Sequence, residues 1–119
     1  MLENYQTFAA GREHSLVLKA DCSLWTFGGN SYGQLGNGSR VRQKRPVRVS
    51  DNIVSVAVGS YHSLVLKTDG SLWTFGWNRC GQLGDGTHIT RKIPIKIMSD
   101  VASMAGGCDH SLVDRKSVV

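Results

Sequence analysis

A repeat of 48 residues constrains the fold of this chain more than any other feature. Residues 59–106 are identical to residues 11–58 at 24 of 48 aligned positions, without a gap. A third copy begins at Gly107, because the run Gly107-Cys-Asp-His110-Ser-Leu-Val113 lies 48 residues after its counterpart. A chain with such a period is expected to stack copies of one structural unit, each contacting its neighbours.

The composition of each unit predicts strands. In the second copy, residues 54–58, 63–67 and 72–75 are short runs rich in β-branched and aromatic residues, bounded by Gly or Asp. Asp69-Gly70 separates two of these runs, as in a β-hairpin. A fourth run, 94–97, starts with a proline, which suits an edge strand. Because the strands are apolar on both faces, we predict an all-β fold in which four antiparallel strands form one β-propeller blade, covered by its neighbours.

The residues that recur between copies are interpreted as blade architecture. Glycines allow turns with positive φ, tryptophans supply apolar area, and each recurring histidine is predicted to hydrogen-bond a neighbouring backbone group, since no acidic residue recurs beside it. Cys22 replaces Gly70, which predicts a strained turn of about 1 kcal/mol. These structural positions are Gly11, His14, Trp25, Gly28, Gly33, Gly36, Gly59, His62, Trp73, Gly76, Gly81, Gly84, Gly107 and His110.

Charge provides a candidate binding segment. The net charge is +5, and residues 40–48 are unusually basic. Such a patch could bind nucleic acid, an acidic protein surface or phospholipid, or could simply keep a loop solvated. We treat this segment as a partner-binding loop with five candidate residues, Arg40, Arg42, Lys44, Arg45 and Arg48.

Catalysis, cofactors and metals are not predicted. The sequence contains no nucleophile–base pair and no metal-binding spacing, and the segment 28–33 is rich in glycine but lacks the helix and lysine of a phosphate-binding loop. Three cysteines, far apart and odd in number, indicate unpaired thiols. No apolar run is long enough for a signal peptide or a membrane span, so we expect no membrane partner and a cytoplasmic or nuclear location.

The repeat resembles a known family. The string Gly59-x-x-His62-Ser-Leu-Val-Leu-Lys-x-Asp-Gly-Ser-Leu-Trp73-x-Phe-Gly76-x-Asn-x-x-Gly81-Gln-Leu-Gly84-Asp-Gly, followed by Pro94, is similar to the regulator-of-chromosome-condensation repeat. The resemblance runs from about residue 7 to residue 113 and implies part of a seven-bladed ring. It divides the chain into the end of a preceding blade or its inner strand (1–10), two repeats (11–58 and 59–106) and the start of a third (107–113).

The resemblance implies binding rather than catalysis. Members of the family include the exchange factor of the small GTPase Ran, chromatin binders and modules beside ubiquitin-ligase domains, so the fold does not choose among functions. We expect a protein–protein interaction scaffold, with an acidic surface or a small GTPase as partner. The alternatives are guanine nucleotide exchange, whose inserted wedge has no place in a gapless repeat, and association with chromatin or nucleic acid through residues 40–48, which is not favoured.

The repeat pattern stops after Val113. Residues 114–119 replace the expected Leu-Lys-x-Asp-Gly and resemble a translated sequencing adapter. We therefore expect a non-native tail, with the natural protein continuing differently. Two units and part of a third would leave sheet faces and edges uncovered, so the isolated chain is expected to be marginally stable or to associate.

Overall fold

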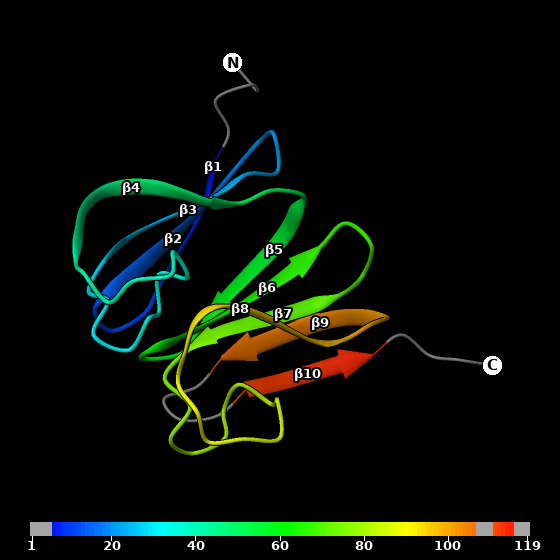
Figure 1. Cartoon of the computed structure of the whole chain (residues 1–119). Helices are drawn as coiled ribbons and strands as arrows, with labels where there is room; N and C mark the ends of the chain where they lie inside the picture. The colour runs from blue at the N-terminus through cyan, green and yellow to red at the C-terminus, as the bar shows by residue number, and fades with distance from the viewer. Residues whose placement is uncertain (1–5, 107–110, 116–119) are drawn as a thin grey trace.

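The chain forms two four-stranded antiparallel sheets and the first pair of strands of a third (Figure 1). The computed structural model describes residues 6–106 and 111–115. The first sheet contains β1 (Gln6–Ala10), β2 (His14–Lys19), β3 (Leu24–Gly28) and β4 (Gln43–Ser50). The second contains β5 (Ile53–Val58), β6 (His62–Lys67), β7 (Leu72–Gly76) and β8 (Arg91–Met98), and the pair is β9 (Val101–Gly106) and β10 (Ser111–Arg115). The prediction of an all-β fold with four antiparallel strands per blade is confirmed.

The sheets and the sequence repeats are out of phase. Each sheet follows chain order, and its first strand comes from the end of the preceding repeat. Thus β5 belongs to the repeat 11–58 but pairs with β6 of the second sheet. Residues 114 and 115, the start of the predicted tail, belong to β10, whose register with β9 shifts between them. Residues 116–119 lie outside the described residues.

The predicted hairpin turns join the second and third strands of each sheet. Asp69 follows β6, and its carboxylate accepts hydrogen bonds from the Ser71 amide and hydroxyl at 2.9 and 2.5 Å. Gly70 has φ of +84° at this turn. Cys22 occupies the same place in the first sheet with φ of +69°, which confirms the predicted left-handed conformation of a non-glycine residue.

The fourth strands begin earlier than the sequence predicts. The sequence suggests a strand over 94–97, whereas β8 starts at Arg91. The pairing of β8 with β7 shifts in register between Thr74, which pairs with Ile95, and Gly76, which pairs with Arg91. Pairing with Gly76 extends β8 back to Arg91. Pro94 therefore lies in the irregular stretch of an edge strand, where its missing N–H leaves no gap in the ladder.

Two apolar clusters join the sheets. The first, between the first and second sheets, contains Leu16, Leu24, Ile53, Val65 and Phe75. The second, between the second and third sheets, contains Leu64, Leu72 and Val101. Adjacent residues on one strand thus face opposite neighbours, as expected for a sheet covered on both sides. Each such side chain contributes about 1.5–3 kcal/mol when fully buried.

One glycine shows how closely the sheets approach. Gly36 has φ of +70°, and a Cβ atom at this position would lie 2.8 Å from the ring of Phe75. Phe75 itself is fully buried. A side chain at position 36 would therefore push the second sheet away from the first. No helix in the described part of the chain is long and apolar enough to cross a membrane.

Candidate functional site

The recurring histidines lie between sheets. Nε2 of His14, at the start of β2, is 3.0 Å from Oγ of Ser63 in the second sheet. That hydroxyl donates to the backbone carbonyl oxygen of Gln34 at 3.0 Å, so its hydrogen bond with His14 must be one in which the hydroxyl oxygen accepts. His62, Ser111 and the Gln82 carbonyl repeat the arrangement at 3.0 and 2.6 Å. The sequence predicts that each histidine bonds a backbone group, and the structure shows that a serine hydroxyl links the imidazole ring to that backbone carbonyl. We call each arrangement a His–Ser–Gln staple.

Burial keeps His14 neutral. Its side chain is only 2% exposed. Desolvation, followed by the charge of the nearby His62, lowers the pKa of His14 to about 4. A neutral ring with its proton on Nε2 suits a structural bond to Ser63.

The other repeated residues also take structural positions. Positive φ angles occur at six of the recurring glycines but not at Gly11 or Gly59; the six are Gly28, Gly33, Gly36, Gly76, Gly81 and Gly84. A Cβ on Gly11 would lie 2.6 Å from the Gly59 carbonyl oxygen, so these two positions meet between the sheets. Trp25 and Trp73 each donate Nε1–H to a serine and lie under a lysine ammonium group. Gly107 and His110 lie outside the described residues.

The structure does not bring the five basic candidates together as one loop. All five are exposed, but Lys44, Arg45 and Arg48 lie on the edge strand β4, and only Arg40 and Arg42 precede it. Arg48 forms an ion pair with Asp51 after the end of β4. The loop predicted over 40–48 is therefore wrong over most of its length, because the valines at 47 and 49 extend the fourth strand through this basic segment.

Arg40 and Arg42 share a hollow with an acidic residue. The hollow has a volume of about 310 Å³ and is lined by Glu13, Gly29, Asn30, Ser31, Arg40 and Arg42. Asn30 positions the arginines, since its buried Nδ2 donates to the carbonyls of Ser39 and Val41 at 2.9 and 3.1 Å. The hollow lies at the edge of the sheets that carries the β1–β2 and β3–β4 connections. We call this edge the connection rim.

Three aromatic side chains gather on the same rim, across the two sheets. Tyr32 lies in the β3–β4 connection, Tyr61 immediately before β6, and Trp77 immediately after β7. Their ring centroids are 5.1 to 5.9 Å apart, and the pairs are tilted or edge-on. The three residues, all partly exposed, form what we call the aromatic trio. Arg12 joins the two sheets nearby through its amide, which donates to the Ser60 carbonyl at 3.0 Å.

Sequence reasoning assigned none of the three residues of the trio to a binding site. The available signal is a departure from the repeat: Tyr32 corresponds to Cys80, Tyr61 to Glu13, and Trp77 to Gly29. The three aromatic residues, Arg40 and Arg42 therefore occupy positions that differ between copies. Such positions can change without disturbing the sheets, and so are suited to recognition.

The described residues form no group of three or more His, Cys, Asp or Glu side chains that could hold a metal ion. Cys22 and Cys80 are unpaired, and Cys108 lies outside the described ranges. What this rim offers chemically is aromatic surface beside cationic side chains.

Comparison with known proteins agrees with this architecture. The regulator of chromosome condensation (RCC1) repeat matches residues 6–34 and 53–82 in one description of the repeat and residues 21–66 and 69–113 in another. Together these matches cover most of the chain. The chain belongs to the RCC1 repeat family. The family resemblance seen in the sequence is thus confirmed. In this chain the repeated residues form the His–Ser–Gln staples and the close glycine contacts between sheets.

Several known proteins resemble parts of the chain. The X-linked retinitis pigmentosa GTPase regulator homolog of Caenorhabditis elegans is 42% identical over 53 residues, which are 43% of this chain and 4% of that protein. The Saccharomyces cerevisiae protein Prp20p, described with its binding to Gsp1p and histones, has a TM-score of 0.83 at 22% identity. Human WBSCR16 has a TM-score of 0.86 at 21% identity. The two structures match 93% and 97% of this chain, which spans 31% and 32% of theirs.

Proposed function

We propose that the chain is part of a protein-interaction scaffold, whose connection rim binds an acidic segment of a partner protein. The observation that carries the proposal is the aromatic trio, which lies on the same rim as the hollow containing Arg40 and Arg42. Tyrosine, tryptophan and arginine are the residue types most enriched at the energetic centres of protein interfaces.

The charge of the rim supports an acidic partner. Arg40 and Arg42 are exposed and form no ion pair within residues 6–106 and 111–115, unlike Arg48 and Arg91, which pair with aspartates. Their guanidinium groups are therefore available to a carboxylate, with which arginine makes paired hydrogen bonds. The aromatic trio would add apolar contact that a purely electrostatic site lacks.

The proposal is tested with a fluorescent peptide of alternating glutamate and leucine residues. We expect the double variant Arg40→Ala/Arg42→Ala to bind it at least about tenfold more weakly, as for the loss of charge-assisted contacts at an interface. The matched control is Lys67→Ala/Lys96→Ala, which removes equal charge from the second sheet near Asp69, at the edge opposite the connection rim. Equal losses in both double variants would show only nonspecific attraction and would contradict the proposal.

A second candidate is chromatin or GTPase association. It is favoured by the similarity to Prp20p, whose described partners are Gsp1p and histones. If the basic residues bind DNA, affinity for a short duplex should fall steeply with salt, by about one logarithmic unit of slope per phosphate contact. Exchange activity would appear as faster release of labelled GDP from a small GTPase. Either result, unchanged by Trp77→Ala, would favour this candidate over the aromatic rim.

A further inference from the structure

The hollow that contains Arg40 and Arg42, which we call the arginine hollow, also contains an acidic side chain. Glu13 lines it from the β1–β2 connection and is exposed. Within residues 6–106 and 111–115 the ion pairs are those of Arg48 and Arg91, and the carboxylate of Glu13 makes neither an ion pair nor a hydrogen bond. The arginine hollow therefore offers a ligand one free carboxylate beside two free guanidinium groups.

A backbone bridge fixes the position of Glu13. Its carbonyl oxygen accepts a hydrogen bond from the Gly29 amide at 2.6 Å, and a Cβ atom on Gly29 would lie 3.0 Å from the Cβ atom of Glu13. The second sheet repeats this bridge between Tyr61 and Trp77, at 2.9 Å. In the second sheet both bridged positions carry aromatic rings. In the first sheet Gly29 has no side chain, so the space beside Glu13 stays open.

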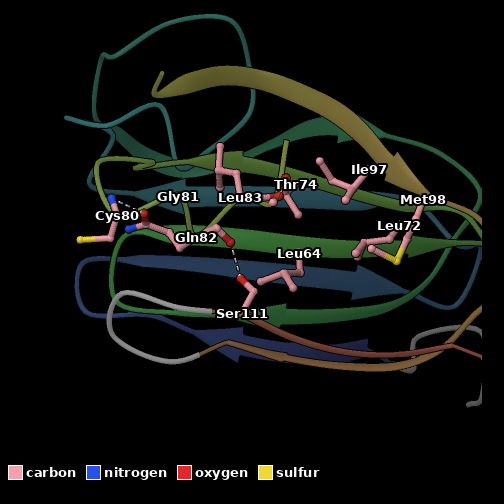
Figure 2. A pocket seen from close by; sticks show the side chains of 11 residues that line it. Leu64, Leu72, Thr74, Cys80, Gly81, Gln82, Leu83, Ile97, Met98 and Ser111 are labelled. Carbon is pink, nitrogen blue, oxygen red and sulfur yellow. Dashed lines mark hydrogen bonds between the residues drawn. The ribbon is translucent and has the colours of Figure 1, made fainter. Parts of the chain in front are cut away.

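The connection that follows the bridge has the same local structure in both sheets. The side-chain oxygen of Gln82 accepts a hydrogen bond from the Cys80 amide at 2.9 Å (Figure 2). The side-chain oxygen of Gln34 accepts from the Tyr32 amide in the same way, at 2.8 Å. The arginine hollow therefore arises from a change of side chains on a backbone that both sheets share.

An unpaired carboxylate beside two arginines has a consequence for an acidic partner. Glu13 repels any carboxylate that approaches Arg40 and Arg42 from its side, and it attracts a cation there. The chain as a whole has the opposite preference, because its net charge is +5. Glu13 thus reverses the charge locally within a basic rim, and such a reversal favours one register of a bound segment over others.

We propose that Glu13 selects acidic partner segments that also contain a lysine or an arginine. The partner's cation pairs with Glu13 in the space that Gly29 leaves open, and its flanking carboxylates bind Arg40 and Arg42. This inference rests on the proposed function of the connection rim and specifies its partner as a segment of mixed charge, with a basic residue between acidic ones. The pair with Glu13 sets the register, because sliding the segment would bring like charges together.

The test compares two fluorescent peptides that differ at one residue. One is the peptide of alternating glutamate and leucine, and in the other a lysine replaces the central glutamate. We expect the lysine peptide to bind the 119-residue chain at least about threefold more tightly, as for one exposed ion pair with relief of repulsion. Nonspecific attraction to a chain of net charge +5 would give the opposite order. Equal affinities, or tighter binding of the all-glutamate peptide, would overturn the proposal.

Three chain variants assign the preference to one side chain. Glu13→Gln keeps the shape of the side chain and should abolish the preference for the lysine peptide, and Glu13→Lys should reverse it. The matched control is Asp100→Asn, which removes the same charge from an exposed residue beside the Gly70 turn, at the edge opposite the connection rim. This control should keep the preference. A preference that survives Glu13→Gln, or that Asp100→Asn abolishes as well, would refute the role of Glu13.

Failure of the proposed function would look different from failure of this inference. If the rim binds no acidic segment, neither peptide binds, or both bind Arg40→Ala/Arg42→Ala as well as the unmodified chain, and the inference falls with the function. If the all-glutamate peptide binds through the arginines but lysine brings no gain, only the inference fails.

A second readout does not depend on affinity. Carbodiimide treatment of the complex should link the amine of the peptide lysine to the carboxylate of Glu13, as identified by mass spectrometry, because the two groups are in contact. Links to other carboxylates alone would overturn the proposal.

Discussion

Replacing Ser63 by alanine is the sharpest test of how the sheets are joined. Its hydroxyl accepts from His14 and donates to the Gln34 carbonyl, and all three residues are at most 2% exposed. The substitution leaves the buried Nε2–H of His14 and the buried backbone carbonyl of Gln34 without their hydrogen-bond partner. An unsatisfied buried group costs about 1–3 kcal/mol, so we expect Ser63→Ala to lower the free energy of unfolding by at least about 2 kcal/mol.

The assay is urea unfolding followed by tryptophan fluorescence, and Ser15→Ala is the matched control. Ser15 has the same place on β2, but its hydroxyl makes no hydrogen bond within the ranges that the structure describes. We expect the control to change the unfolding free energy by less than about 0.5 kcal/mol. If the two serine variants lose equal stability, the His–Ser–Gln staple contributes nothing beyond local packing, and the reasoning fails.

Three further predictions concern single residues. Burial lowers the pKa of His14 from 6.5 to about 4, so the unfolded chain binds more protons than the folded chain between these pH values. In urea titrations, the unfolding free energy should be highest above pH 6.5 and should fall by up to about 3 kcal/mol as the pH drops to 4, with a smaller fall in His14→Gln. Cys22→Gly should raise the unfolding free energy by about 1 kcal/mol by relieving the positive φ, measured as a higher melting temperature, whereas Gly70→Cys should lower it by a similar amount. Asn30→Ala and Asn78→Ala should each cost at least about 2 kcal/mol in urea unfolding by removing the anchor of a β3–β4 or β7–β8 connection, but only Asn30→Ala should also weaken binding of the acidic peptide.

Much of the fold can be predicted from the repeat. Leu72 and Phe75 are apolar residues on opposite faces of one strand, and they enter different clusters because a sheet lies on each side. The Asp69-Gly70 turn follows from local chemistry alone. The start of β8 could not be predicted, because its register with β7 shifts at an irregularity in the strand pairing that Pro94 alone does not reveal.

The candidate site is less visible in the sequence. Arg40 and Arg48 are close along the chain, but the strand between them carries Arg48 away toward Asp51. Tyr32 and Trp77 are far apart along the chain and meet only because the β3–β4 connection of one sheet reaches the next, with ring centroids 5.6 Å apart. Periodicity identifies the residues that build the sheets, whereas the residues of the proposed binding rim break the period.

The central claim, that the connection rim binds an acidic protein segment, is tested most directly by a hydrogen–deuterium exchange footprint. The chain would be compared with and without the acidic peptide at saturating concentration. We predict slower exchange at residues 12–13, 29–32, 40–42 and 60–61 and at Trp77, with no change at the opposite turns around Cys22 and Gly70. Protection at those turns, or along β4 and β8 alike, would contradict the account.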